Sequence, residues 1–289
     1  MKQDKFLLGA ILLALAVGLP GGSVASTPQA TQDSGVLDAT SYATSDASRD
    51  VLFQASTITA LMNGVFDGSM TYKELGEHGD FGLGTFNRLD GEMVELDGRI
   101  FQVKTDGVAY PVNDSMITPF ADVTFFDADE KISFNESANL TGLQGFLLSK
   151  MSSKNIFYAI RIDGTFDYVK TRSVPPQSKP YPNLTTAVKN QSIFQFYNQS
   201  GTIVGFWSPS YVSGVNVAGY HFHFLTEDRK AGGHLLDLRL KNASIAIDYT
   251  PEFFMALPEG DQFAQADLSG ASQSDLKKIE SNPSPGKAR

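Results

Sequence analysis

The most constraining feature of the chain is a group of three histidines within fourteen positions, in a sequence that holds only four. His221 and His223 lie in the segment VAGYHFHFLT (217–226), whose β-branched and aromatic residues are typical of a strand. Because successive strand side chains point to opposite faces, the two histidines share one face and the neighbouring aromatic residues share the other. The chain must therefore form a sheet here that carries imidazoles on one surface.

The third histidine follows a polar turn that contains glycine. His234 opens the apolar run HLLDLRL (234–240), which would return alongside the first strand and place its first residue opposite the histidine pair. Three neutral imidazoles on one face, in a chain without cysteine, suit a divalent ion such as Zn²⁺ with positions left open for substrate. The pair His221 and His223 alone is more typical of two satisfied polar residues, and His234 is what favours a metal site.

The first 25 residues have the features of a secretory signal peptide. Lys2 and Lys5 precede an apolar run from Phe6 to Leu19, and Ser23-Val24-Ala25 is a small-residue cleavage site. The run is short for a membrane span, so a retained anchor is the less favoured alternative. We therefore expect an exported protein, periplasmic or extracellular, in which residues 26–49 form a flexible linker rich in Ser, Thr, Ala and Asp.

Composition narrows the partners and the source of stability. The net charge is −9 and the sequence has no basic run, which argues against nucleic acid and, for the mature form, against anionic membrane surfaces. The absence of cysteine means that an exported protein of this kind depends on core burial and not on disulfides. The 21 phenylalanines and 10 tyrosines favour a strand-rich fold with a well-filled core.

Short apolar runs separated by turn residues predict antiparallel strands. Asp90-Gly91 and Asp97-Gly98 are hairpin turns that bracket a strand over 92–96, with 99–103 as its partner. The same signals predict further strands and turns along the chain. These are a hairpin of 155–162 with 165–172 about Asp163-Gly164, a turn at Asn198-Gln199-Ser200-Gly201 between 193–197 and 202–207, and a separate strand over 243–249.

Capping residues and helical spacing predict a few short helices. Ser56 caps a helix that carries Leu61 and Met62, and Thr71 with Glu74 forms the capping box of a second helix. Apolar residues at helical spacing predict a longer helix within 136–150, and shorter ones are expected near 185–190 and 275–279.

These elements predict an α+β fold of two packed halves of mostly antiparallel, curved β-sheet with a few short helices. Residues 50–174 form an N-terminal α+β half, and residues 175–257 form a C-terminal β half that carries the three histidines. Four prolines between 175 and 182 mark the boundary. Residues 258–289 form a polar C-terminal tail.

Other polar residues are weaker candidates. Glu92 starts a strand directly after a tight turn, where its side chain can face a pocket, although a solvated strand-end carboxylate is equally expected. His78 is interpreted as a solvated loop residue, and Arg161 or Arg172 as a partner in a structural ion pair. The glycine-rich segment 79–92 lacks the motifs of a phosphate-binding loop, so close backbone approach is the preferred interpretation.

Several long segments resemble the bacterial α-acetolactate decarboxylase family, and together they cover essentially the whole mature chain. The resemblance implies a carboxy-lyase that converts 2-acetolactate to (R)-acetoin and CO₂. The matching segments are LFQASTITALMNGVFDG (52–68), GDFGLGTFNRLDGEM (79–93), NIFYAIRIDGTF (155–166), Arg172 to Pro182, GTIVGF (201–206) and GYHFHFLTED…GGH (219–234).

The resemblance also implies the cofactor and the chemistry. Zn²⁺ is expected at the three histidines of the motif, which are His221, His223 and His234. Loss of CO₂ from a 2-hydroxy-3-keto acid leaves an enediolate, and a zinc ion chelated by the ketone and hydroxyl oxygens stabilises its charge. The resemblance further implies a homodimer, and it leaves open whether 2-aceto-2-hydroxybutyrate is a second substrate.

Four more residues receive roles from the resemblance. Glu92 in the LDGE segment would deliver a proton to the enediolate carbon, and Arg172 would orient the substrate. Thr85, in the GLGT segment, would line the pocket. A glutamate in the tail of family members folds back onto the site, and its spacing from Phe263 assigns that place to Glu280.

Two other functions are compatible with the histidines alone. The spacing His221-x-His223-x₃-Glu227 imitates the first motif of cupin-type metalloenzymes such as dioxygenases. The glycines after Glu227 are poorly spaced for that motif, and His234 comes too soon for the later cupin histidine. A non-catalytic zinc-binding or structural β protein is the third possibility, and it would need neither Glu92 nor Arg172.

Overall fold

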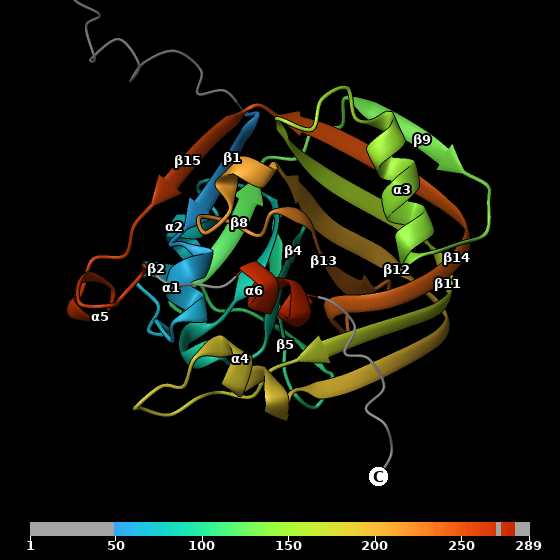
Figure 1. Ribbon diagram of the computed structural model, residues 1–289. Coiled ribbons are helices and arrows are strands. Elements are labelled where there is room, and N and C mark those ends of the chain that lie inside the picture. Colours follow the sequence, from blue (N-terminus) through green and yellow to red (C-terminus); the bar gives the residue numbers. More distant parts are fainter. Residues whose placement is uncertain (1–48, 270–272, 281–289) are drawn as a thin grey trace, which may run out of the picture. The chain divides into compact units, whose positions relative to one another are not determined.

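A computed structural model describes residues 49–269 and 273–280 of the chain. The expected signal peptide, residues 26–48 of the expected linker and residues 281–289 of the tail lie outside these ranges. The described residues form two sheets, a short two-stranded ribbon and several short helices (Figure 1). The fold is strand-rich, with curved, mostly antiparallel sheets, as the sequence predicted.

The first sheet has seven strands and is antiparallel except at one edge, where β1 and β15 run parallel. The predicted strand 92–96 and its partner 99–103 are confirmed, and both residues of the turn Asp97-Gly98 have positive φ. In spatial order the strands are β15 (Glu252–Ala256), β1 (Val51–Ala55), β8 (Phe120–Thr124), β3 (Phe81–Thr85), β4 (Glu92–Leu96), β5 (Arg99–Val103) and β6 (Ala109–Pro111).

The second sheet is built from long antiparallel strands. β14 pairs with β11 along its length, β11 pairs with β12, and β12 pairs with β13, which returns to pair with the first residues of β14. Two short strands pair with the rest of β14. The bounds are β9 (Glu130–Phe134), β10 (Ala138–Asn139), β11 (Phe157–Ser173), β12 (Ser192–Ser208), β13 (Gly219–Thr226) and β14 (Gly232–Thr250); β2 (Met70–Thr71) and β7 (Ile117–Thr118) form the ribbon.

Two predicted chain reversals and one predicted strand break in this sheet are wrong. The chain does not turn at Asp163-Gly164 or at 198–201, and 243–249 continues β14 without a break. Gly164 and Gly201 are register partners inside the ladder, where a Cβ would lie 2.9 Å from the Asn242 carbonyl oxygen and 2.5 Å from that of Leu225. These glycines therefore allow neighbouring strands to approach closely, and they do not mark turns.

The two sheets do not coincide with the two predicted halves of the sequence. β11 precedes the proline-rich segment, yet it lies inside the second sheet between β12 and β14. β15, from the end of the C-terminal half, pairs with β1 in the first sheet. The prolines occupy the connection from β11 to the next helix, so the boundary at 174–175 separates two stretches of sequence and not two sheets.

The helices are short and mostly begin where the sequence predicted. Thr71 and Glu74 form the predicted capping box, whereas the first helix is capped by Thr57 and not by Ser56, whose φ is +65°. Within the described ranges, no helix combines the length and the apolar character that a bilayer crossing requires. The helices are α1 (Ile58–Met62), α2 (Tyr72–Leu75), α3 (Leu140–Lys150), α4 (Leu184–Ala187), α5 (Asp261–Ala264) and α6 (Gln273–Glu280).

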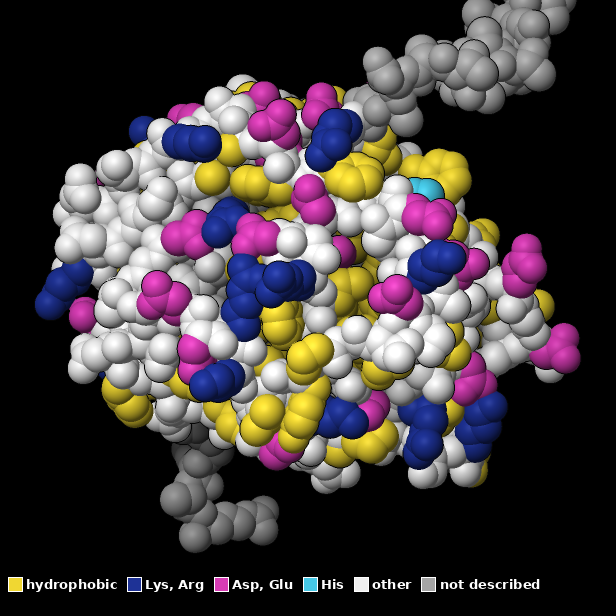
Figure 2. Space-filling model, turned by 180° about the vertical axis from the view of Figure 1, so that it is seen from behind, with side chains coloured by type: hydrophobic (Ala, Val, Ile, Leu, Met, Phe, Trp, Pro, Cys, Tyr) yellow, Lys and Arg dark blue, Asp and Glu magenta, His cyan; other side chains and the backbone are white. Residues whose placement is uncertain are grey.

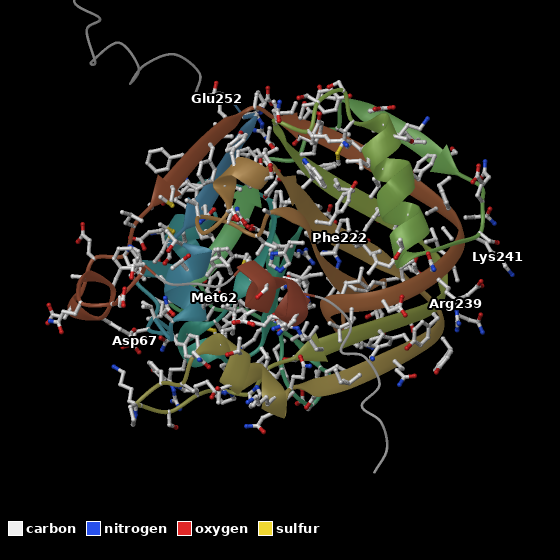
Figure 3. The ribbon with its side chains drawn as sticks, in the orientation of Figure 1. Met62, Asp67, Phe222, Arg239, Lys241 and Glu252 are labelled. Atoms are coloured by element: carbon white, nitrogen blue, oxygen red, sulfur yellow. The ribbon has the colours of Figure 1, made fainter. Side chains whose placement is uncertain are left out.

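The sheets and helices enclose several apolar clusters. One cluster joins the inner faces of the two sheets, with Leu83 and Val94 from the first and Val204 and Phe206 from the second. Another lies inside the second sheet beneath α3 and includes Phe222 (Figure 3). On the face shown in Figure 2, acidic and basic side chains of the described residues are interspersed with apolar ones.

A further apolar cluster brings α6 back to the body of the fold. Leu276 and Ile279 of α6 are buried against Leu61 of α1 and Leu184 of α4, and α6 is drawn between α1 and the long strands in Figure 1. The predicted helix in the C-terminal tail is confirmed. Its last residue, Glu280, is carried by this packing into contact with the histidines.

Candidate metal centre and catalytic site

The strand register builds the histidine group. His223 of β13 is paired with His234 of β14, and His234 is paired on its other side with Arg172 of β11. Side chains opposite each other in a sheet point to the same face, so these three lie in one row. His221 lies two residues before His223 and shares that face. The sequence therefore places three imidazoles and one guanidinium on a single surface.

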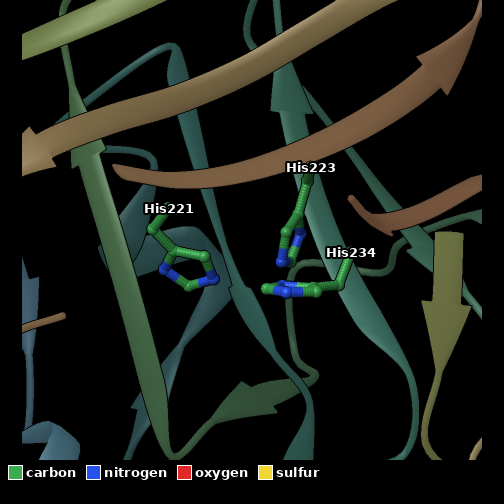
Figure 4. A group of neighbouring side chains, drawn as sticks. All are labelled: His221, His223 and His234. Carbon is green, nitrogen blue, oxygen red and sulfur yellow. The ribbon is translucent and has the colours of Figure 1, made fainter. Parts of the chain in front are cut away.

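The three imidazole rings face one another closely. Each pair of ring centroids is 5.2 Å apart, and one nitrogen from each ring lies within 4.8 Å of the others (Figure 4). All three side chains are buried. This arrangement could hold a metal ion, as the sequence predicted for His221, His223 and His234.

Hydrogen bonding prepares the nitrogens for a ligand role. His223 Nδ1–H donates to the Met93 carbonyl oxygen at 2.6 Å, which leaves Nε2 as the free acceptor. That Nε2, His221 Nδ1 and both ring nitrogens of His234 are buried without a hydrogen-bond partner. Orphaned buried nitrogens are costly unless something binds them. Because one nitrogen from each ring lies close to the other two, the group fits a divalent cation held by neutral imidazole.

Burial also keeps these imidazoles in the form that binds metal. Burial and, to a smaller extent, the charge of the nearby Arg172 guanidinium together lower the pKa of His221 to about 3. Burial likewise brings the pKa values of His223 and His234 well below their ordinary range. At neutral pH no proton competes with a metal ion for these nitrogens.

Two carboxyl groups reach the same centre. Glu280 Oε2 lies 3.5 Å from His234 Nε2 and 3.6 Å from His221 Nε2, and this oxygen is buried without a hydrogen-bond partner. Glu92 Oε2, on the other side, lies 3.7 Å from His223 Nε2. Both sequence-predicted glutamates therefore lie beside the three imidazoles.

Arg172 lies between the two glutamates. Its two terminal nitrogens are 3.5 Å from Glu92 Oε1 and 4.0 Å from Glu280 Oε1, and its Nε has no hydrogen-bond partner. Burial raises the pKa of each carboxyl to about 7, and the Arg172 charge opposes that rise. The site therefore holds a fixed cation beside carboxyl groups that can exchange protons near neutral pH.

Thr85 lines the same cavity, but its hydroxyl is already engaged. It donates to the Gly91 carbonyl oxygen at 2.7 Å, and Thr85 is the register partner of Glu92 in the β3–β4 pair. The carbonyl of Thr85 accepts from the Tyr72 hydroxyl at 2.9 Å. In this structure Thr85 fixes the turn that precedes Glu92.

The polar groups form one side of a small cavity of about 40 Å³. Its other side is apolar, and sequence reasoning did not identify these residues as part of a site. A helical spacing signal marked α1 as apolar, but nothing in the sequence showed which core it would face. The apolar lining consists of Ile58, Leu61, Leu89, Phe120, Val174 and Leu184.

Two candidates lie elsewhere. His78 is exposed, as predicted, and its ring stacks on Phe53 with centroids 3.8 Å apart. Arg161 pairs with Asp97 and Asp163, each at 2.7 Å, and is a structural ion-pair partner. Neither residue contributes to the cavity.

Replacing Gly233 with alanine is expected to weaken metal binding through the backbone. Gly233 has φ +129°, and a Cβ would lie 2.4 Å from the Arg172 carbonyl oxygen, so β14 must move away from β11 and carry His234 with it. Backbone strain of this kind costs about 1–3 kcal/mol. Urea unfolding and titration with Zn²⁺ should both show the loss.

Gly145→Ala provides the matched control. Gly145 lies on α3, where a Cβ meets no atom within 4 Å. Alanine at a compatible helical position stabilises by about 0.4–1 kcal/mol. We expect this variant to bind metal normally. Unchanged metal affinity in Gly233→Ala would contradict the role of that glycine.

Comparisons with known proteins identify the family of the chain. The family model for alpha-acetolactate decarboxylase matches residues 52–270. The alpha-acetolactate decarboxylase of Methanosarcina mazei is 53% identical over 236 residues, which is 82% of each chain. That of Brevibacillus brevis is 42% identical over 275 residues, covering 93% of this chain and 95% of the relative.

A solved structure shows the same fold. The crystal structure of alpha-acetolactate decarboxylase from Bacillus subtilis strain 168 aligns with a TM-score of 0.78 at 40% identity. The alignment covers 80% of this chain and 99% of that structure. The family model, the relatives and the fold thus agree, and this chain belongs to the alpha-acetolactate decarboxylase family.

Proposed function

We propose that the protein is a zinc-dependent decarboxylase that converts 2-acetolactate to (R)-acetoin and CO₂. The observation that carries the proposal is the convergence of three imidazoles, two carboxyl groups and one guanidinium on one buried cavity. Membership of the decarboxylase family supports this reaction over a cupin-type oxidation. The handedness of the product and the choice of zinc rest on the family resemblance.

The reaction needs a place for an electron pair. When CO₂ leaves a 2-hydroxy-3-keto acid, the electrons of the broken C–C bond move onto the adjacent ketone and give an enediolate. When held by His221, His223 and His234, Zn²⁺ would supply Lewis acidity toward that charge, typically worth several kcal/mol.

Arg172 is suited to hold the substrate carboxylate. Its side chain is 6% exposed, and Nε has no hydrogen-bond partner among the described residues. Arginine binds carboxylates with two parallel hydrogen bonds, which fix orientation as well as position. A carboxylate held in this way would have its C–C bond to the carbinol carbon in a defined direction, and orientation contributes directly to rate.

Glu92 is suited to deliver the proton that completes acetoin. Its carboxyl lies beside Arg172 and His223 at the edge of the cavity, so it can reach one face of the enediolate carbon. Burial raises the pKa of this carboxyl to about 7 in the metal-free site, which favours the protonated form that a proton donor requires. Delivery to one face would give a product of one hand.

Export and dimerisation are further proposals. The basic start and apolar run of residues 1–25 support export, and sequencing the N-terminus of the secreted protein tests it. The family resemblance supports a homodimer, and sedimentation equilibrium of the mature protein tests that. A monomer at micromolar concentration would contradict the second proposal.

Chelation and metal replacement test the activity itself. We expect the mature protein to release acetoin and CO₂ from racemic 2-acetolactate, to lose this activity after chelation, and to regain it when Zn²⁺ is added. Mg²⁺, which prefers oxygen ligands, serves as the control ion and should not restore activity. Folded, zinc-loaded protein without activity would overturn the proposed function.

A further inference from the structure

We propose that Leu89 sets the largest alkyl group that the site accepts on the carbinol carbon of a 2-acyl-2-hydroxy acid. This inference rests on the proposed decarboxylation and concerns the apolar side of the same cavity. It begins with the backbone of the loop between β3 and β4.

The backbone of this loop is held in an unusual conformation. Arg88 has φ +64° and Leu89 has φ +60°, the left-handed region that bulky side chains rarely occupy. Such conformations persist only where the surrounding structure enforces them, and they gather at functional sites. Glycine would adopt this conformation without strain, so leucine at this position calls for an explanation from its side chain.

Hydrogen bonds from three other segments enforce the conformation. They come from the chain after α1, from β5, and from the segment that follows Arg172. The bonds are Arg88 N–H to the Phe66 carbonyl (2.7 Å), Gly68 N–H to Asn87 Oδ1 (2.9 Å), Gln102 Nε2 to the Asp90 carbonyl, Gly91 N–H to the Val174 carbonyl (3.0 Å) and Gln177 N–H to the Arg88 carbonyl (2.7 Å).

The strained loop presents one side chain to the cavity. Leu89 is 3% exposed and lines the cavity together with Glu92 and Arg172. Glu92 follows it by three residues, and the bond from Gly91 to Val174 ties the loop to the strand that carries Arg172. The position of Leu89 relative to both polar groups is therefore fixed by the backbone.

A rigid wall is what discrimination by size requires. The carboxylate held by Arg172 is attached to the carbinol carbon, so the alkyl group on that carbon would lie against the apolar lining of the same cavity, to which Leu89 belongs. The other apolar lining includes Leu61 of α1 and Leu184 of α4, and α1 is hydrogen-bonded through its main chain to the segment 214–215. Leu89 instead lies in the loop that leads directly into Glu92 and that is hydrogen-bonded, from Gly91 to Val174, to the segment following Arg172.

The test compares substrates that differ by one methylene. The rate of CO₂ release is measured for three substrates. The first is 2-acetolactate, the second is its homologue with an ethyl group on the carbinol carbon, and the third is the isomer of that homologue in which the extra carbon is on the acyl side. In Leu89→Ala we expect the kcat/KM ratio of the ethyl homologue to 2-acetolactate to rise about tenfold or more, since one methylene in an apolar pocket is worth roughly 10–200-fold. The ratio for the acyl-side isomer should change much less.

Two variants serve as controls, and the ratio cancels any loss of folded protein. Leu61→Ala enlarges the same cavity from α1 and should raise the ratio less than Leu89→Ala. Leu75→Ala removes a fully buried leucine of α2 that packs on the outer face of the first sheet. This variant should leave the ratio unchanged. The inference would be overturned if Leu89→Ala left the kcat/KM ratio unchanged, or if it raised the ratio more for the acyl-side isomer than for the ethyl homologue. Turnover of 2-acetolactate by the wild-type protein would in either case leave the proposed function standing. Wild-type protein that is inactive when zinc-loaded would instead overturn the proposed function.

Discussion

Replacing His234 with alanine is expected to remove the bound metal and to reduce turnover to background. His234 is one of the three imidazoles that could hold the ion, and its strand partners, His223 and Arg172, leave no further histidine beside it. Loss even of an outer partner of a metal ligand costs about 10–100-fold in affinity, and loss of the ligand itself should cost more. Metal content after purification and CO₂ release from 2-acetolactate measure the two effects.

The fourth histidine of the chain provides the control. His78 is exposed and stacks on Phe53, outside the cavity. His78→Ala should therefore retain one metal ion per chain and wild-type turnover. Circular dichroism should show both variants folded. The buried histidines are uncharged at neutral pH, so His234→Ala removes no charged group on which the fold depends. His234→Ala with full metal content and normal turnover would contradict the assignment of the metal centre.

Strand parity and a short turn were enough to predict that three histidines come together where they could hold a metal ion. His221 and His223 share a face in any strand, and a turn of fixed length brings His234 opposite them. Glu92, Arg172 and Glu280 could not be assigned by such local rules. They come from three different elements: the register of β11 with β14 places Arg172, the packing of the first sheet on the second brings Glu92, and the packing of α6 brings Glu280. The family resemblance supplied what local reasoning lacked.

The long strands show where turn signals mislead. Asp97-Gly98 is a true turn because the two strands it joins are neighbours with a two-residue connection. Asp163-Gly164 has the same composition, but Gly164 is held between β12 and β14, with Gly201 and Ala243 as partners. Glycine is favoured in both places, for positive φ in the first and for close approach in the second. A single sequence does not distinguish the two uses.

The conformation of Leu89 illustrates a different limit. Leucine gives no local signal for positive φ, and the bonds that enforce it come from residues that are distant in the sequence. The Met93 carbonyl that orients His223 is a backbone group and has no sequence signal at all. Backbone groups therefore hold the site residues in place, and their positions cannot be recognised from residue types in the sequence.

Glu92→Gln is expected to retain the metal but to lose turnover by about 10²–10⁴-fold, the usual worth of a positioned proton donor. Glutamine keeps the size of the side chain and can still meet Arg172, but it carries no proton for the enediolate carbon. Stopped-flow CO₂ release, metal content and the optical purity of the acetoin formed are the measurements. Normal turnover in this variant would remove Glu92 from the mechanism.

Glu95 on the same strand allows the chemical role of Glu92 to be separated from its burial. Glu95 is three residues further on and faces the opposite side of the sheet, where burial raises its pKa to about 8. A carboxyl whose pKa rises from 4.5 on folding keeps a proton that the unfolded chain releases, so stability falls as pH rises from about 4.5 through the raised pKa. In metal-free protein, Glu92→Gln and Glu95→Gln should each flatten this fall in the free energy of unfolding. Of these two variants, only Glu92→Gln should also lose turnover, because the Glu92 carboxyl faces the cavity and that of Glu95 does not.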